Sequence, residues 1–273
     1  VVADADTGVD WDHPSLKPHY RGWDGANVNH DYNWLDATSA HSPTPVDGHG
    51  HGTFTTSQMV GDDGGANQIG VAPGAEWIGC RNMDNGGNGS PSTYITCFEF
   101  LIAPYPVNGN PGQGDPDLSP DSINNSWGCP ASEGCSWDTL QAIVEAVRAA
   151  GIFPAMAAGN SGSACKTVVD PPAIYDASVS VGATNSADKI ASFSSRGPVT
   201  VDGSRRLKPD ISAPGENIRG AVPGTGYQSG WSGTSMATPH LAGAVALLWQ
   251  AKPSLIGNID ASEAAFTATA KPR

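Results

Sequence analysis

Ser235 stands in the sequence context that a catalytic nucleophile requires. It lies in the segment GTSMATPH, residues 233–240, and an apolar run follows at once. A small turn flanked by Gly that delivers a Ser to the start of a buried helix holds the hydroxyl at the edge of a cleft, within reach of a base. A base and a group that orients it are therefore expected elsewhere in the chain, in similarly tight turns.

The candidates for these two roles are His51 and Asp6. His51 lies in DGHGHGT, residues 47–53, and Asp6 ends the short apolar strand VVADAD at the start of the chain. A Ser hydroxyl is a poor nucleophile at neutral pH, and imidazole, with an ordinary pKa of about 6.5, accepts and returns its proton. Asp6 would fix the imidazole tautomer and stabilise the imidazolium without taking the proton. Asp, His and Ser in this chain order form one of the known orders of a catalytic triad.

Each of the three residues also has an ordinary structural role open to it. Asp6 can cap a turn, His51 can begin a helix, and Ser235 can be a helix N-cap. Taken singly, each structural interpretation is the stronger one. Taken together and in this order, the three contexts favour catalysis.

Neighbouring residues raise metal-binding alternatives. His49 and His51 form a His-x-His pair, but no matching cluster of ligands lies nearby in the sequence. Acidic residues at positions 4, 6, 10 and 12 suggest a calcium loop, yet Gly8 has the wrong offset and no Glu closes the loop. The sequence therefore identifies no metal ligand. His51 is preferred to His49 because only His51 is followed by Gly-Thr.

Five segments, in sequence order, resemble the subtilase family. They are Asp6-Thr7-Gly8 with His13-Pro14, His51-Gly52-Thr53, residues 124–128 (NNSWG), residues 157–162 (AAGNSG) and residues 233–239. Residues 20–22, 33–34, 59–61 and 67–74 are similar to the bacillopeptidase F-like branch in particular. The resemblance covers nearly the whole chain and implies a three-layer subtilisin-like α/β fold, with a mostly parallel central sheet and helices on both faces. It also implies a secreted serine endopeptidase that hydrolyses peptide bonds through an acyl-enzyme on Ser235.

The same resemblance implies further site residues. The side-chain amide of Asn160 and the backbone N–H of Ser235 would donate to the oxyanion of the tetrahedral intermediate, and a cap or turn role is the alternative for Asn160. An extended peptide would lie between a substrate-binding strand and a Gly-rich segment, with main-chain hydrogen bonds to both. The substrate-binding candidates are Ser126, Trp127 and Gly128 on the first side and Gly87 and Asn88 on the second.

Asp170 is the candidate determinant of specificity. Counting back from Tyr175, it resembles the floor of the first specificity pocket of subtilases, where many relatives have a small or neutral residue. A carboxylate there favours Lys or Arg before the cleaved bond, because a desolvated charge needs an opposite partner. The alternative is that Asp170 points away and caps the turn at Pro171 and Pro172.

Three positions depart from the family pattern. Phe54 stands where many relatives have a second His, and Ser57 where they have a Gly, so both changes concern packing behind the candidate base. Ser15 stands where relatives have an Asp that binds calcium. No cofactor is expected for catalysis, and a structural calcium ion stays open, with Asp62 and Asp63 as other loop carboxylates.

Composition limits the partners of the chain. Its 14 Lys and Arg against 27 Asp and Glu give a formal charge of −13, which repels nucleic acid and anionic membranes. The longest apolar runs are shorter than the roughly 18 residues of a membrane span. Protein or peptide substrates, the chain's own propeptide as a transient inhibitor and a monomeric state are the expectations that remain.

The cysteine content indicates an exported, oxidised protein. Five cysteines are present, and Cys80 with Cys97 and Cys129 with Cys135 are the candidate disulfides. Cys165 is the fifth and is an alternative partner for Cys129 or Cys135. Buried free thiols are the other alternative.

Apolar strand-like and helix-like runs alternate along the 273 residues, which predicts one domain, a subtilase catalytic domain over residues 1–273. The predicted strands cover residues 1–5, 77–80, 152–158 and 178–181, and the predicted helices residues 92–102, 139–150 and 236–251. Residues 108–119 are predicted to be an exposed insertion. The chain opens in the strand that leads to Asp6, without a signal peptide, so a processed chain, truncated at one or both termini, is expected.

Other functions remain open at this stage. A catalytically inactive relative would bind peptides without cleaving them. A serine esterase or amidase is disfavoured because no Gly-x-Ser-x-Gly surrounds Ser235. A carboxyl-type protease of the same fold with a Glu base is disfavoured by the intact His51 segment.

Overall fold

A parallel sheet of seven strands forms the centre of the protein, whose computed structural model describes residues 1–272. The strand order is β2-β3-β1-β4-β5-β6-β7, and every neighbouring pair runs parallel. The strands span Trp34–Asp36 (β2), Trp77–Arg81 (β3), Val2–Asp6 (β1), Ser122–Asn125 (β4), Phe153–Ala157 (β5), Val179–Thr184 (β6) and Ile211–Pro214 (β7). Their carboxyl ends meet at one edge, where ligands of such sheets bind.

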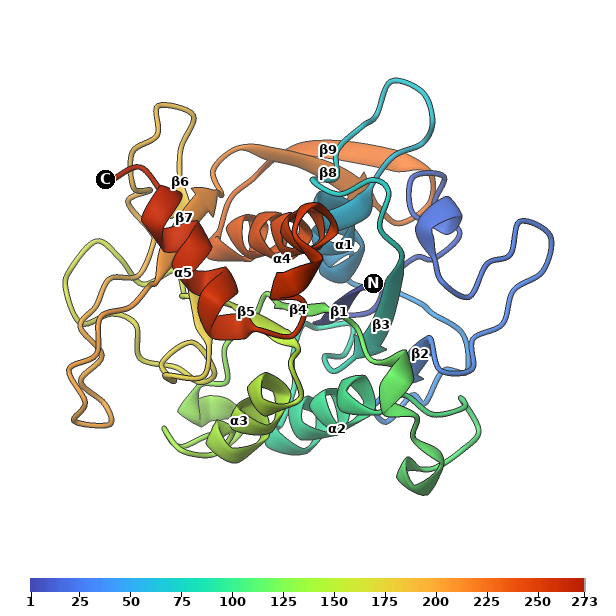
Figure 1. Ribbon diagram of the computed structural model, residues 1–273, viewed down its shortest axis with the longest axis horizontal. Helices are drawn as coiled ribbons and strands as arrows, with labels where there is room; N and C mark the ends of the chain where they lie inside the picture. Colours follow the sequence, from blue (N-terminus) through green and yellow to red (C-terminus); the bar gives the residue numbers. More distant parts are fainter. Residues whose placement is uncertain (273) are drawn as a thin grey trace.

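Helices cover both faces of this sheet, which confirms the predicted three-layer α/β architecture (Figure 1). Helices α1, α4 and α5 lie on one face and α2 and α3 on the other (Figure 1). The helices span His51–Val60 (α1), Pro91–Ile102 (α2), Gln141–Ala149 (α3), Thr234–Ala251 (α4) and Ile259–Thr269 (α5). None of these helices is long and apolar enough to cross a membrane.

Strand β1 places two carboxylates beneath the helices of one layer. Side chains alternate between the two faces of a strand. Ala3 and Ala5 belong to the apolar cluster that includes α2 and α3, whereas Val2 belongs to the cluster that includes α4. Asp4 and Asp6 therefore lie on the α1 and α4 face, and both are buried.

Helix α4 runs through the middle of its layer and packs closely against α1. A side-chain carbon at Gly243 would lie 3.1 Å from the carbonyl oxygen of Met59. A larger residue at this crossing would therefore require α1 to shift slightly. Pro239 lies inside α4 and has no N–H to donate. The carbonyl of Ser235, four residues earlier, is consequently left without its helical hydrogen bond.

The sequence located some of these elements and missed others. The predicted strands correspond to β1, β3, β5 and β6, and the three predicted helices to α2, α3 and α4. Strands β2 and β7, helix α5 and the antiparallel hairpin of β8 (Ile218–Val222) and β9 (Gly226–Trp231) were not predicted, and the strand expected at residues 124–128 overlaps β4 only at residues 124 and 125. β2 has only three residues and β4 reads SINN, so neither carries an apolar run that reveals a strand.

The predicted insertion at residues 108–119 is a largely exposed loop with two short 3-10 turns, Pro111–Gln113 and Pro116–Leu118.

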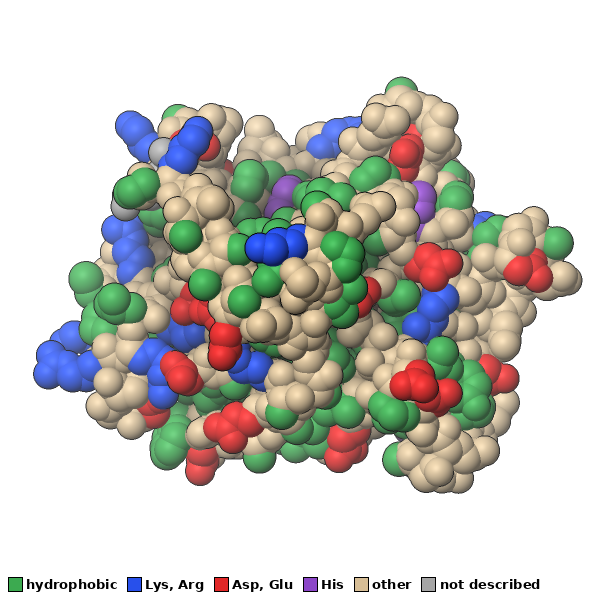
Figure 2. Space-filling model, in the orientation of Figure 1, with side chains coloured by type: hydrophobic (Ala, Val, Ile, Leu, Met, Phe, Trp, Pro, Cys, Tyr) green, Lys and Arg blue, Asp and Glu red, His purple; other side chains and the backbone are tan. Residues whose placement is uncertain are grey.

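Over the face drawn in Figure 2, acidic and basic side chains are interspersed among polar ones.

Two disulfides tie the fold together. Cys80 in β3 pairs with Cys97 in α2, and Cys129 pairs with Cys135 in the loop after β4, with Cα separations of 5.6 and 5.7 Å. Both candidate pairings are confirmed. Cys165 is exposed and free, so its alternative pairing with Cys129 or Cys135 was wrong.

We expect the unreduced, unfolded protein to show one reactive thiol, that of Cys165. Replacing Cys80 and Cys97 together by Ser should lower the free energy of unfolding by about 3 kcal/mol, because the open chain regains the entropy of a long loop. Thiol titration in denaturant and equilibrium unfolding measure the two effects, and Cys165→Ser is the control that removes the titratable thiol. A count of five thiols in the wild type would contradict both pairings.

Candidate active site

Asp6 and His51 form a hydrogen-bonded pair at the carboxyl edge of the sheet, with Asp6 buried and His51 partly exposed. Asp6 is the last residue of β1 and His51 the first of α1. His51 Nδ1 lies 2.7 Å from Oδ1 and 2.9 Å from Oδ2 of Asp6, whose side chain is fully buried. The backbone N–H of Thr7 also donates to Asp6 Oδ1, at 2.7 Å. The Asp6 carboxylate accepts these bonds, so Nδ1 carries the proton and Nε2 is left as the basic nitrogen.

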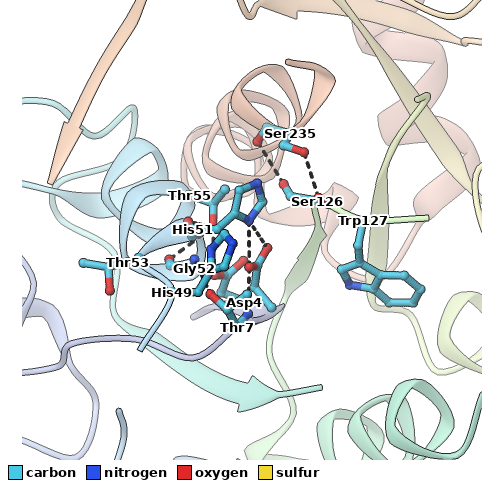
Figure 3. Close-up of polar contacts among 12 residues, drawn as sticks. Asp4, Thr7, His49, His51, Gly52, Thr53, Thr55, Ser126, Trp127 and Ser235 are labelled. Carbon is cyan, nitrogen blue, oxygen red and sulfur yellow. Dashed lines mark hydrogen bonds and ion pairs between the residues drawn. The ribbon is translucent and has the colours of Figure 1, made fainter. Parts of the chain in front are cut away.

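His49 does not share this arrangement. It is exposed, and its ring centroid lies 6.2 Å from that of His51 (Figure 3). Of the two histidines, the structure brings His51 to the carboxylate of β1.

The environment of His51 raises the pKa of its imidazole. Burial of the ring disfavours the charged form, but the charge of Asp6 and its hydrogen bond outweigh that effect. The imidazolium is therefore stabilised relative to a free His, which is the property wanted of a base that holds a proton during a reaction.

Asp47 connects the two turns that carry this pair through hydrogen bonds. Its carboxylate accepts hydrogen bonds from the backbone N–H groups of His49, Gly50 and Thr53 and from the hydroxyls of Thr7 and Thr53. These bonds satisfy donors at the start of α1 that have no helical partner. The sequence interpretation had not given Asp47 a role, although it directly precedes the His segment.

Two glycines let the end of β1 and the start of α1 touch. Gly8 has φ +107°, and a side-chain carbon on Gly52 would lie 2.0 Å from the carbonyl oxygen of Gly8. Any larger residue at 52 would push α1, and His51 with it, away from Asp6.

Ser235 and Ser126 bind each other reciprocally. Ser235 Oγ donates to the carbonyl of Ser126 at 2.8 Å, and Ser126 Oγ donates to the carbonyl of Ser235 at 2.9 Å (Figure 3). The second bond exists because Pro239 leaves that carbonyl free of the helix. Within residues 1–272 no hydrogen bond joins Ser235 to His51, so the hydroxyl must leave Ser126 to reach the imidazole. Catalytic hydrogen bonds are commonly long until substrate binds.

Asn160 binds the protein through its amide oxygen. Its Oδ1 accepts from the backbone N–H and the hydroxyl of Thr234, at 2.8 and 3.0 Å. A backbone N–H needs an oxygen acceptor, which fixes which end of the amide faces Thr234. Nδ2 is consequently free to donate to a ligand, so the cap role and the ligand role of Asn160 coexist.

A pocket of about 250 Å³ lies beside these residues. It is lined by Ser126, Trp127, Gly128, Pro130, Ala157, Ala158, Gly159, Asn160, Ser161, Thr167, Val169, Asp170, Ser195, Thr234 and Ser235. Five of the predicted substrate or oxyanion residues thus meet around Ser235. Residues 126–128 lie just beyond the end of β4 rather than in a strand, which corrects the expectation for that segment.

Trp127 contributes to the pocket as a support. Its ring stacks on Tyr94 with centroids 3.9 Å apart, and its Nε1 donates to the carbonyl of Ala5 at 2.8 Å.

Gly87 and Asn88 lie outside the residues that line the pocket. They belong to a turn capped by the Asp84 carboxylate, with Gly87 beside the ring of His49.

Comparison with known proteins decides the family. The profile of the Subtilase family matches residues 1–271. The chain belongs to the subtilase family. It is 43% identical to bacillopeptidase F of Bacillus subtilis (strain 168) across 100% of its length and 34% identical to subtilisin E of the same organism across 93%. These identities confirm the recognition of the family and of its bacillopeptidase F-like branch.

The chain spans only 19% of the length of bacillopeptidase F and 56% of that of subtilisin E. Among solved structures, a cold adapted subtilisin-like serine proteinase matches 98% of the chain with a TM-score of 0.71 and 27% identity, covering 81% of that chain. Sphericase has the same fold, with a TM-score of 0.77 at 24% identity over 98% of this chain and 82% of its own.

One departure from the family pattern has a structural explanation. Phe54 is fully buried and stacks on Trp231 of β9, with ring centroids 4.4 Å apart and planes 9° from parallel. Trp231 also lies 6.4 Å from the His51 ring. The hairpin thus borders the site through an aromatic pair that the sequence interpretation missed, because the two residues lie far apart in the chain.

Asp4 is a second buried carboxyl behind Asp6. Its Oδ2 lies 3.0 and 2.9 Å from the hydroxyls of Thr55 and Thr56 in α1, and its Oδ1 accepts from Asn124 Nδ2 in β4 at 2.7 Å. Burial raises its pKa well above the ordinary range, and the charge of Asp6 adds to the effect. Asp4 therefore connects the strand of Asp6, the helix of His51 and the strand that precedes Ser126.

The loop carboxylate of Asp63 is hydrogen-bonded within the protein. It accepts hydrogen bonds from Gly65, Asn67 and Tyr227, and these bonds, the side chain of Asn67 foremost, lower its pKa to about 2. Among residues 1–272 no group of three or more His, Cys, Asp or Glu side chains is placed to hold a metal. A structural calcium ion stays a prediction.

The raised pKa of His51 predicts the acid limb of activity. If neutral His51 is the base, activity falls as pH drops through this pKa, so the limb lies above the ordinary value of about 6.5. Asp6→Asn removes the charge that raises the pKa and should move the limb to lower pH, while kcat falls by roughly 10⁴-fold because the tautomer is lost. The pH profile of kcat/KM measures both. A limb unmoved by Asp6→Asn would show that Asp6 does not set the basicity of His51.

Asp4 predicts a pH dependence of stability. Its raised pKa means that the folded protein holds this proton more tightly than the unfolded chain, so its contribution to stability declines as pH rises above about 3.9. Asn at position 4 cannot titrate, so the Asp4→Asn variant does not lose this contribution. As pH rises from about 4 to about 8, the free energy of unfolding of Asp4→Asn should therefore increase relative to that of the parent. Measurements in a Ser235→Ala background avoid self-digestion.

Asp4→Leu is the matched comparison. It removes the acceptor of the Thr56 hydroxyl and one of the two acceptors of the Asn124 amide, and should cost about 1–3 kcal/mol, because buried donors lose their partners. Equal differences between Asp4→Asn and its parent at both pH values would contradict a raised pKa of Asp4.

Proposed function

We propose that this chain is a secreted serine endopeptidase that cleaves peptide bonds through an acyl-enzyme on Ser235. The observation that carries the proposal is that Ser235 and Asn160, whose amide nitrogen is free, line one pocket, while His51, bound to Asp6, lies beside Ser235 (Figure 3). These are the base, nucleophile and oxyanion donor of acyl transfer.

The first half of the reaction forms the acyl-enzyme. Ser235 Oγ leaves the carbonyl of Ser126, gives its proton to His51 Nε2 and forms a bond to the substrate carbonyl carbon. The resulting oxyanion accepts from Asn160 Nδ2 and from the backbone N–H of Ser235, which has no helical acceptor in the first turn of α4. His51 then returns the proton to the leaving amine as the C–N bond breaks.

The second half repeats these steps with water. His51 takes a proton from a water molecule that attacks the acyl carbon, and Ser235 leaves with that proton. Throughout, Asp6 holds the imidazole in one orientation and stabilises its charged form.

A peptide is the substrate that suits the surroundings. We propose that an extended chain crosses the mouth of the pocket between residues 126–128 and the turn of Gly87 and Asn88. His49 touches that turn and lies beside the His51 ring, which supports its position at the rim. Two disulfides support an extracellular location. A propeptide as a transient inhibitor and a monomeric state follow from membership of the family and belong to the same proposal.

A fluorophosphonate probe tests the proposal, because it labels only an activated Ser. We expect labelling of the wild type, none of Ser235→Ala, and a loss of peptidase kcat/KM of roughly 10⁶-fold in Ser235→Ala and in His51→Ala alike. The double variant should be little worse than either, because the residues act as a unit. His49→Ala is the matched control and should stay active.

Other results point elsewhere. A wild type that binds peptides without labelling would be an inactive binding module. One that hydrolyses small esters and no peptide would be an esterase. Activity in His51→Ala with none in His49→Ala would show that His49, and not His51, is the base.

A further inference from the structure

Asp170 is the one ionisable side chain among the residues that line the 250 Å³ pocket beside Ser235. The rest of the lining consists of apolar, hydroxyl, glycine and amide groups, and it includes no Lys, Arg or His. The field inside the pocket is therefore set by a single acidic group.

The Asp170 carboxylate has no partner. It is half-buried, and within residues 1–272 no hydrogen bond or ion pair to it is found, in contrast with Asp47, which binds donors on both oxygens. The next two residues, Pro171 and Pro172, have no N–H to offer. The alternative in which Asp170 caps this turn therefore lacks the hydrogen bonds that would define a cap.

The facing wall leaves room for a ligand beside this carboxylate. Gly128 faces Asp170, and a side-chain carbon at that position would lie 3.4 Å from Asp170 Cβ. The backbone N–H of Cys129 donates to the carbonyl of Pro171 at 2.7 Å, and the disulfide to Cys135 closes the loop behind it. The two walls are thus held together close to Asp170, and Gly128 adds no bulk between them.

Partial burial without a partner disfavours the charged form of Asp170, and it raises the pKa of the carboxyl. An apolar side chain entering the pocket would displace the remaining water and leave the charge unpaired. A cationic side chain would compensate that charge, because a desolvated carboxylate is stabilised by an opposite partner within contact.

We infer that Asp170 makes this pocket selective for a Lys or Arg side chain on the acyl side of the cleaved bond. The inference rests on the proposed function, since it concerns the substrate of the same Ser235 site. Arg would bind through two parallel N–H bonds and Lys through a point charge. Binding of the cation positions the carbonyl of the same residue, which Ser235 attacks, beside Ser235 and Asn160, so the contact raises kcat/KM.

Peptides that differ only at the residue before the cut test this inference. The series holds Lys, its apolar isostere norleucine, Arg, its neutral isostere citrulline, and Leu and Phe. We expect the wild type to prefer Lys to norleucine and Arg to citrulline by at least about 30-fold in kcat/KM. Asp170→Asn, which keeps the shape and removes the charge, should reduce both ratios to near unity. Asp176→Asn, on an exposed acid of the same loop, is the matched control that should preserve them.

Fluorophosphonate titration of each variant separates this inference from the proposed function. A labelled wild type that prefers Leu or Phe, or a preference for Lys that survives in Asp170→Asn, overturns the role of Asp170 and leaves the peptidase assignment intact. A wild type that neither labels nor cleaves overturns both. Should Asp170→Asn fail to fold, inhibition of the wild type by butylamine in excess of butanol supports the inference, and equal inhibition by the two overturns it.

Discussion

The buried carboxylate of Asp6 is the constraint on which the arrangement of this site depends. A charged group with a fully buried side chain is tolerated only when its oxygens are hydrogen-bonded, and His51 and the N–H of Thr7 supply those bonds. Meeting that demand brings the first residue of α1 onto the end of β1, which the glycines at 8 and 52 make sterically feasible. The same requirement extends behind the site, where Asp4 is bound from α1 and β4 rather than exposed.

The position of Ser235 follows from a second requirement: a carbonyl that loses its helical hydrogen bond to a proline needs another donor. A proline inside a helix is usually unfavourable, because the residue four positions earlier loses its hydrogen bond. In α4 the proline is Pro239 and the residue that loses its bond is Ser235, for which Ser126 replaces the missing donor. The returned bond from Ser235 Oγ holds the hydroxyl beside β4. Helix α4 is therefore fixed at Ser235 to the segment that follows β4.

The sequence singled out Asp6, His51, Ser235 and Asn160 as candidates because each lies in a short contiguous segment rich in small residues that resembles a family motif. It missed Trp231 and the partners of Asp4, because those contacts join residues that lie far apart in the chain, as with Asn124 and Asp4. The resemblance placed Gly87 and Asn88 against the substrate, whereas their turn lies outside the pocket lining. Short strands such as β2 and β7 were missed because pairing with neighbours, rather than their own apolar pattern, makes them strands.

The polar groups in and beside the pocket fall into two sets, which differ in whether the protein already binds them. The carboxylates of Asp6 and Asp47 and the oxygen of Asn160 are bonded within the protein, which fixes their geometry before any ligand arrives. Three groups are left open on the same pocket: Asn160 Nδ2, the N–H of Ser235 and the carboxylate of Asp170. Two donors side by side suit a developing oxyanion, and an unpaired anion in the same pocket suits a cation. A peptide with a basic side chain next to the reacting carbonyl satisfies all three at once, which neither an apolar residue nor a small ester does.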